Sequence, residues 1–161
     1  MGEVLDYKID IDTKEVVKAF RDWRAHLPRC VEMILKRTGE RIAGDIKAKY
    51  LTGQSLNVGT GRLRNSIGSK MIGREAVDVG SLTEIARVVY AAIHEFGGEI
   101  NPKNAKMLSW IGKDGKRVFA KKVVMPASPY VRPAIDKYFS SGRAKRMSEL
   151  TIQQYINRDF G

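Results

Sequence analysis

The feature that most constrains the fold is a long amphipathic pattern between residues 31 and 50. Apolar side chains recur there at helical spacing over about six turns, and basic residues such as Lys36 and Arg41 lie between them. A helix of this kind must lay its apolar stripe against another layer of secondary structure. Gly39 and Gly44 lie inside the pattern, where a glycine either weakens the helix or lets another backbone approach closely. The stripe consists of Val31, Ile34, Leu35, Thr38, Ile42, Ile46 and Tyr50.

A separate helix is predicted before this one. Asp12 is suited to be its N-cap, because Glu15 follows in a capping-box arrangement. We expect the helix to run to about residue 26 and Pro28 to occupy the first turn of the next helix. Residues 4–11 alternate loosely between apolar and polar side chains and predict a short strand. The apolar stripe of this first helix is formed by Val16, Phe20, Trp23 and Leu27.

The middle of the chain predicts a first antiparallel hairpin. Residues 52–61 are rich in Gly, Ser, Thr and Asn and indicate a loop, which ends in a short turn. Two strands are then expected at about 67–72 and 75–80, with a turn at Gly73 between them. The second of these strands shows the period-two alternation of a half-buried strand.

A second hairpin is predicted further along. The segment 87–96 indicates a strand that enters a short helical turn. Asp114 and Gly115 then separate two apolar and aromatic runs, 107–111 and 117–124, and an Asp-Gly pair in this context is a strong hairpin signal.

The C-terminal part predicts two helices, one from residue 130 or 131 to about 139 and one over 143–160. Together these elements predict an α+β fold, in which a long N-terminal helix and C-terminal helices cover one face of an antiparallel sheet of about four strands. The length of 161 residues suits a single domain. We expect its core to span about 29–139, with 143–161 as a helical extension.

Composition limits the partners and the compartment. The net charge of +11 favours an acidic partner, either nucleic acid or an acidic protein surface. The single cysteine, Cys30, excludes an internal disulfide and lies in a helical apolar pattern, where cysteine behaves as a small hydrophobe. No apolar run is long enough to predict a membrane-spanning helix, and the first residues do not resemble a signal peptide. We therefore expect a protein that stays in the cytoplasm where it is made.

Signatures of catalysis are missing from the sequence. His94 stands beside Glu95, a pair that resembles a base with its orienting acid, but a structural turn before Gly97 explains both residues. His26 lies far away in sequence. Hydrolase motifs, metal-ligand spacings and phosphate-binding loops are also missing. The sequence predicts a protein that is not an enzyme and that needs no cofactor or metal ion.

Basic residues cluster in two stretches without many acids. Arg62 and Arg64 lie in the first stretch, and the second surrounds the tip of the predicted hairpin over 106–122. Such residues favour either contact with DNA phosphates, without sequence readout, or a solvated surface that faces an acidic protein. The second stretch contains Lys113, Lys116, Arg117, Lys121 and Lys122. Neighbouring aromatic residues, namely Tyr90, Phe96, Trp110, Phe119 and Tyr130, are expected in the core.

Three ordered segments carry a resemblance to a known family. They are 60–67 (TGRLRNSI), 90–98 (YAAIHEFGG) and 125–135 (MPASPYVRPAI). In this order, after a long N-terminal helix, they resemble the tail-completion proteins of double-stranded DNA phages. These include the phage virion morphogenesis family typified by the G protein of Mu-like phages, and related minor tail-component proteins. The match covers about 29–139, and Ser128 departs from it because the family often has Arg there.

The resemblance implies an architectural use of the shared residues. They are Gly61, Leu63, Tyr90, Glu95, Phe96, Gly97, Pro126, Pro129, Tyr130, Arg132 and Pro133. The glycines suit tight turns, the prolines suit an extended entry followed by a helix start, and the Arg132 side chain is expected to pair with Glu95.

The resemblance also implies a place in the virion, at the neck between tail and head. The expected partners are other virion proteins, namely the tail tube or terminator and the head–tail connector, and five further copies of the chain in a hexameric ring. Two alternatives stay open: a neighbouring virion part, such as the tail terminator or a head-closure connector, and a free-standing protein that binds nucleic acid non-specifically. Salt-dependent binding to duplex DNA favours the second alternative.

Overall fold

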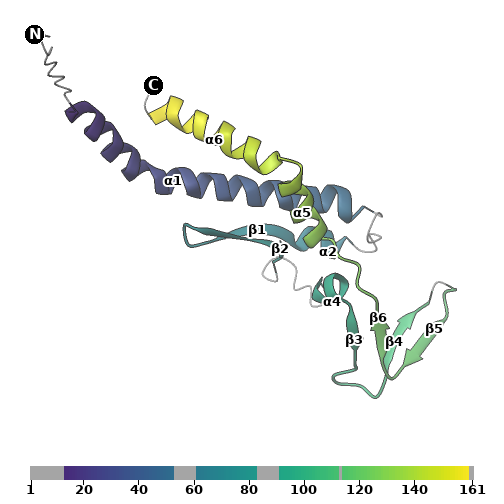
Figure 1. Ribbon diagram of the computed structural model, residues 1–161. Helices are drawn as coiled ribbons and strands as arrows, with labels where there is room; N and C mark the ends of the chain where they lie inside the picture. The colour runs from purple at the N-terminus through teal and green to yellow at the C-terminus, as the bar shows by residue number, and fades with distance from the viewer. Residues whose placement is uncertain (1–12, 53–60, 83–90, 113, 160–161) are drawn as a thin grey trace, which may run out of the picture.

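The computed structural model describes residues 13–52, 61–82, 91–112 and 114–159 (Figure 1). These residues form an α+β fold, as the sequence predicts, with long helices packed on small antiparallel sheets. The predicted strand over 4–11 lies outside the described residues. The helices are α1 (Lys14–Asp45), the π-helical turn η1 (Ile46–Tyr50), α2 (Arg62–Ser66), α4 (Ala91–Phe96), α5 (Arg132–Ser140) and α6 (Arg143–Asp159). The strands are β1 (Ile67–Ile72), β2 (Ala76–Ser81), β3 (Gly98–Ile100), β4 (Leu108–Ile111), β5 (Arg117–Ala120) and β6 (Val123–Met125).

The N-terminal region forms one helix instead of the two that the sequence predicts. Helix α1 continues through Pro28, and its axis changes direction in the N-terminal half (Figure 1). Proline removes one backbone hydrogen bond and crowds the preceding turn, so an isolated helix tends to break there. Contacts with another part of the protein must therefore stabilise α1 at Pro28.

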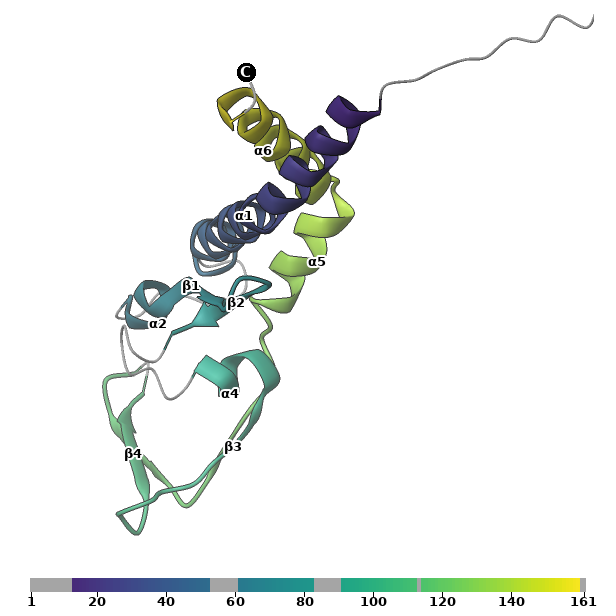
Figure 2. The ribbon, with the colours of Figure 1, turned by 90° about the vertical axis from the view of Figure 1, so that its left-hand side faces the viewer.

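Helix α6 supplies that packing on both sides of the proline. His26 Nδ1 lies 3.0 Å from the Tyr155 hydroxyl, and Cys30 is buried, as its place in the apolar pattern predicts. Further along, the Arg37 guanidinium donates to Thr151 Oγ1 at 3.0 Å and to Gln154 at 2.7 Å. The two helices lie side by side in both views (Figures 1 and 2). The predicted C-terminal helix is thus confirmed, and it docks on α1.

The first predicted hairpin is confirmed, and α1 packs directly on it. Strands β1 and β2 pair antiparallel, from Ile67 opposite Ser81 to Ile72 opposite Ala76. At the contact with α1, a Cβ atom added to Gly39 would lie 2.6 Å from Val77 Cγ2 and 2.9 Å from Ser69 Cβ. Gly39 therefore permits the close approach that its place in the helix suggested.

The two glycines of α1 provide a matched test of this packing. We expect Gly39→Ala to lower the free energy of unfolding by about 1–2 kcal/mol, because overpacking outweighs the helix propensity gained. Gly44 is exposed and a Cβ there would meet no atom within 4 Å, so Gly44→Ala should raise stability. The gain expected at that position is about 0.5–1 kcal/mol. Urea denaturation measures both, and two effects of the same sign would contradict this packing.

The strands form three two-stranded antiparallel sheets among the described residues, where the sequence predicts one sheet of about four strands. Strand β4 pairs with β5 from Leu108 opposite Ala120 to Ile111 opposite Arg117, which confirms the second hairpin. Strand β3 pairs with β6, from Gly98 opposite Met125 to Ile100 opposite Val123, a pairing that the sequence did not indicate.

The core lies between α1, the first hairpin and α5. Ile42 and Ile46 from α1 and η1 pack with Ile67 at the start of β1 and with Tyr130 and Tyr138. The Tyr50 hydroxyl also donates to the carbonyl of Pro133 at 3.2 Å, which ties η1 to the start of α5. The core therefore joins the N-terminal helix α1 to the C-terminal helix α5.

A charged network joins the end of α1 to the start of α6. The Asp45 carboxylate pairs with Arg143 and, at 3.1 Å, with Lys49. Burial raises the pKa of the Asp45 carboxyl, but the hydrogen bonds from Arg143 and Lys49 outweigh it, so its pKa lies below the usual value. The Arg143 guanidinium also lies over the Tyr138 ring, 5.2 Å from its centroid.

This network predicts a pH-dependent stability. Because the pKa of Asp45 is lowered in the folded protein, its carboxylate stabilises the fold above the unfolded-state pKa of about 3.9. That stabilisation is lost as the pH falls through the lower, folded-state pKa. Asp45→Asn should therefore lower the unfolding free energy near neutral pH, and its difference from wild type should shrink below about pH 4. Denaturation at several pH values measures this, and a difference independent of pH would exclude the ionic contribution.

Candidate functional site

The second and third family-like segments meet at the start of α5, where Glu95 caps the helix. Glu95 lies in α4, is buried, and accepts three backbone hydrogen bonds. Its Oε2 accepts from the N–H groups of Tyr130 at 2.7 Å and Val131 at 2.9 Å, and its Oε1 accepts from the N–H of Arg132 at 3.0 Å. A helix leaves its first N–H groups without partners, and a carboxylate there is favoured by both hydrogen bonding and the helix dipole.

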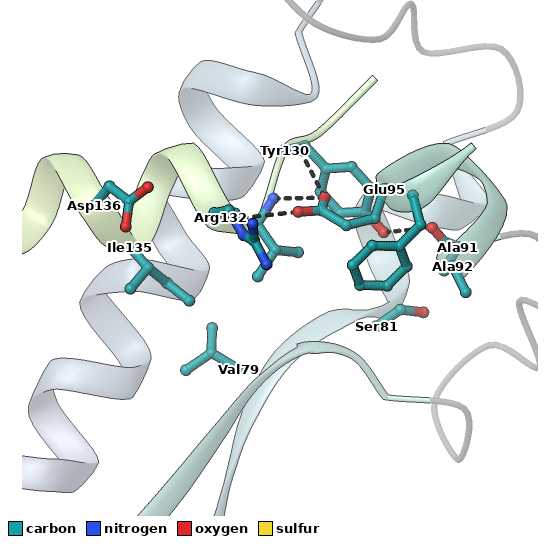
Figure 3. Close-up of a pocket in the computed structure, with 11 residues that line it drawn as sticks. Val79, Ser81, Ala91, Ala92, Glu95, Tyr130, Arg132, Ile135 and Asp136 are labelled. Atoms are coloured by element: carbon teal, nitrogen blue, oxygen red, sulfur yellow. Dashed lines mark hydrogen bonds between the residues drawn. The ribbon is translucent and has the colours of Figure 1, made fainter. Parts of the chain in front are cut away.

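The expected pairing of Glu95 with the Arg132 side chain is therefore wrong in its chemistry. The two residues do meet, but the backbone N–H of Arg132 makes the contact (Figure 3). The guanidinium is exposed and forms no salt bridge with Glu95. A carboxylate surrounded by three converging N–H donors leaves little need for a further donor.

Neighbouring backbone contacts fix the same junction. The buried Tyr130 hydroxyl donates to the carbonyl of Ala91 at 3.3 Å, and burial together with the Glu95 charge raises the pKa of Tyr130 to about 12. Gly97 has a φ of 69°, and a Cβ there would lie 2.7 Å from the backbone nitrogen of Ala127. The N–H of Ser128 donates to the carbonyl of His94 at 2.8 Å. Gly97 is thus required both by its conformation and by the close approach of the returning chain.

The first family-like segment reaches this junction through the core. Gly61 has the expected positive φ, 72°, and precedes α2, a short helix where the sequence predicted a turn. Leu63 packs against the core cluster that contains Tyr130, and the Ser66 hydroxyl lies 2.8 Å from that of Ser81. Tyr90, the remaining aromatic residue of the motif set, lies outside the described residues, as do 87–89. Leu63, Glu95, Gly97 and Tyr130 thus make contacts that hold this part of the fold together.

Residues 98–125 form an arm that projects from the body beyond α4 (Figures 1 and 2). Strands β3 and β6 form its base, and the β4–β5 hairpin forms its end. The hairpin turn is closed by a bond from the Gly112 N–H to the Lys116 carbonyl at 2.8 Å, and Gly115 has a φ of 77°. The turn therefore forms at the Asp-Gly pair, as predicted.

Apolar side chains of the arm are exposed, which contradicts the expectation that its aromatic residues belong to the core. Of the five aromatic residues named, Tyr130 is buried, whereas Phe96 is 71% exposed, Phe119 61% and Trp110 42%. Ile111 is also 60% exposed. Clustered exposed apolar residues indicate an interaction surface in a soluble protein.

The predicted basic residues lie in two separate places. Arg62 and Arg64 are exposed on α2, at the body, whereas Lys116, Arg117, Lys121 and Lys122 are exposed on the arm (Figure 1). Lys113 lies outside the described residues. Lys122 pairs with Glu99 at 2.9 Å, and this contact, followed by the bond from Asn101, lowers the pKa of Glu99 despite partial desolvation. The described basic residues of the two stretches thus lie on different elements, α2 of the body and the β4–β5 and β6 region of the arm.

An apolar groove lies beside the junction, between β2, α4 and α5 (Figure 3). Its volume is about 810 Å³, within the range of about 300–1,000 Å³ that is common for binding pockets. Asp136 stands at one end, exposed and without a salt bridge to another described residue. The groove was not predicted, because its walls come from segments that lie far apart in the sequence. The apolar lining includes Val79, Ala92, Phe96, Val131 and Ile135.

Residues 13–52, 61–82, 91–112 and 114–159 contain no group of acidic, histidine and cysteine side chains suited to hold a metal ion. A helix that could cross a membrane is likewise missing from this part of the chain. His94 lies in α4, and burial lowers the pKa of its imidazole.

Comparisons with known proteins found no match among family models, curated proteins or solved structures.

Proposed function

We propose that this chain is a structural protein of a tailed double-stranded DNA phage or prophage, which completes the tail and joins it to the head. Six copies of the chain form a ring in the neck of the particle, which is assembled in the bacterial cytoplasm. The sequence support is the ordered set of three segments that resemble the tail-completion family. The second and third segments meet at one junction, where Glu95 caps α5 and Gly97 permits the chain to return, and Leu63 of the first segment packs against the adjoining core.

The observation that carries the proposal is the arm. It presents Ile111, Phe119 and Trp110 to solvent on a two-stranded ribbon, and such a ribbon is marginally stable alone in water. A ribbon with exposed apolar residues gains stability when a neighbouring protein covers it. This is what an assembly component requires.

Complementation in extracts tests the proposal. Heads and tails are prepared from a phage or prophage that lacks the gene, and the purified protein is added. We expect infectious particles to form only after the addition, because the missing step is the completion of an otherwise finished tail. Extracts that are equally infectious with and without the protein would contradict the proposal. A head-closure role is distinguished by incubating heads or tails separately with the protein and removing the excess before mixing.

Non-specific binding of DNA is the second candidate, and the charge of the arm favours it. Residues 98–125 contain seven basic residues against Glu99 and Asp114. If these residues contact phosphates, the logarithm of the binding constant should fall with that of the salt concentration, with a slope of about −0.9 per phosphate. Titration of duplex DNA at several salt concentrations measures the slope. Binding that is lost in Lys116→Ala and Arg117→Ala, but kept in Arg62→Ala, would assign the contact to the arm.

A further inference from the structure

The two faces of the β4–β5 hairpin differ in how far their apolar side chains are exposed to solvent. Side chains directly opposite each other in an antiparallel pair share a face, so Ser109, Ile111, Arg117 and Phe119 lie together. We name this set the open face. Ile111 and Phe119 are 60% and 61% exposed, whereas on the other face Trp110 is 42% exposed and Val118 is 37% exposed. The described residues of the chain therefore leave the open face largely uncovered.

The same chain carries a concave surface with matching chemistry. The groove beside α5 is apolar along its walls, as the open face is in Ile111 and Phe119. Its end carries the Asp136 carboxylate, one turn of α5 away from the exposed Arg132 that also lines the groove, and the open face carries the Arg117 guanidinium. Neither charge forms a salt bridge with another described residue, so each remains available for the other.

The arm of the chain itself does not fill the groove. In both views its hairpin lies apart from α5, although the hairpin turn is directed back toward the level of α4 (Figures 1 and 2), and none of the residues that line the groove belongs to the arm. We take the arm of a second copy as the occupant, because its apolar residues and its Arg117 match the groove in chemistry. A projection and a concavity at different places on one chain give a head-to-tail interface, the type that closes into rings.

We propose that the open face of the arm of one copy seats in the groove of the next copy. Phe119 is the apolar anchor in the groove, and Arg117 pairs with Asp136 at its end. A buried aromatic anchor with a charged pair at the rim is the usual composition of a strong contact point in an interface. This inference deepens the proposed function, because it supplies the contact that would build the ring.

Disulfide trapping between two singly substituted chains tests the contact. Ser109→Cys places a thiol on the open face beside Phe119, and Ala92→Cys places one on the exposed wall of the groove. The two chains are mixed under mild oxidation at up to about 1 mM protein, so that a contact with a millimolar dissociation constant is populated. The disulfide between positions 109 and 92 is measured by mass spectrometry.

A matched control gives the rate of random collision. Arg74 is exposed in the turn of the other hairpin, so Arg74→Cys mixed with Ala92→Cys reports collisions that involve no arm. We expect the 109–92 disulfide to form at least about tenfold faster than the 74–92 disulfide, and Phe119→Ser in the arm-bearing chain to remove this advantage. Equal rates for the two pairs would overturn the proposal.

The charged pair provides a second, independent readout. Asp136→Lys in the groove-bearing chain should slow formation of the 109–92 disulfide, and Arg117→Glu in the arm-bearing chain should restore it, because the charges are then exchanged. If Asp136→Lys has no effect, or if the exchange does not restore the rate, the contact is wrong. This test is separate from that of the proposed function, because disulfide trapping does not depend on phage assembly. If the disulfide does not form faster than the control, but deletion of the gene still blocks assembly, the contact is wrong and the proposed function stands.

Discussion

Replacing Glu95 by alanine should remove a large part of the stability of the protein. The carboxylate is buried and accepts from three backbone N–H groups at the start of α5. Without it these donors are buried and unpaired, and we expect a loss of about 3–5 kcal/mol. Small domains are stable by only about 5–15 kcal/mol. Glu95→Ala should therefore unfold partly at physiological temperature, as thermal denaturation followed by circular dichroism would report.

Two further variants separate the cap from a general loss of charge. Glu95→Gln keeps the size and one acceptor oxygen, so we expect a smaller loss of about 1–3 kcal/mol. Glu149 is 62% exposed on α6, and Glu149→Ala should change stability by less than about 0.5 kcal/mol. If Glu95→Ala were as stable as Glu149→Ala, Glu95 would not be the cap that holds α4 to α5.

Removing the apolar side chains of the open face should abolish assembly and leave the fold intact. Ile111 and Phe119 are largely exposed, so the double variant Ile111→Ser/Phe119→Ser should change the melting temperature of the isolated protein little. Anchors of this kind contribute about 2 kcal/mol or more to an interface, or about 30-fold in affinity, and a ring repeats the contact in every copy. We expect this variant to fail in restoring infectivity to a strain that lacks the gene.

The control for this variant is an exposed apolar residue elsewhere. Leu150 is 54% exposed on α6, so Leu150→Ser changes surface hydrophobicity without touching the arm. It should restore infectivity as the wild type does. If both variants restored infectivity equally, the open face would have no part in assembly.

The elements that the sequence predicted correctly are those with local signals. Gly73 and the Asp114-Gly115 pair mark turns whose conformation is set by adjacent residues, and both hairpins are where these signals indicate. The helices α5 and α6 follow in the same way from Pro133 and from the break at Gly142, which has a φ of 72°.

The features that the sequence did not predict depend on distant contacts. Helix α1 continues through Pro28 because α6 packs across it. The β3–β6 pair joins strands separated by the whole arm. The bonds of Glu95 go to backbone N–H groups, which leave no residue-type signal at positions 130–132.

The candidate site was predicted only in part for a related reason. An apolar pattern indicates that a side chain will be covered, but it does not distinguish cover by the same chain from cover by a neighbour. Phe119 and Trp110 were therefore assigned to the core, although both lie exposed on the arm. The hairpin and its basic residues were predicted because they depend on local signals alone.

A role in tail completion is tested by electron microscopy of lysates from a phage or prophage that lacks this gene. We expect filled heads and separate, full-length tails to accumulate unjoined, and expression of the wild-type protein to restore joined particles. Joined, infectious particles in the absence of the gene would contradict a role in tail completion.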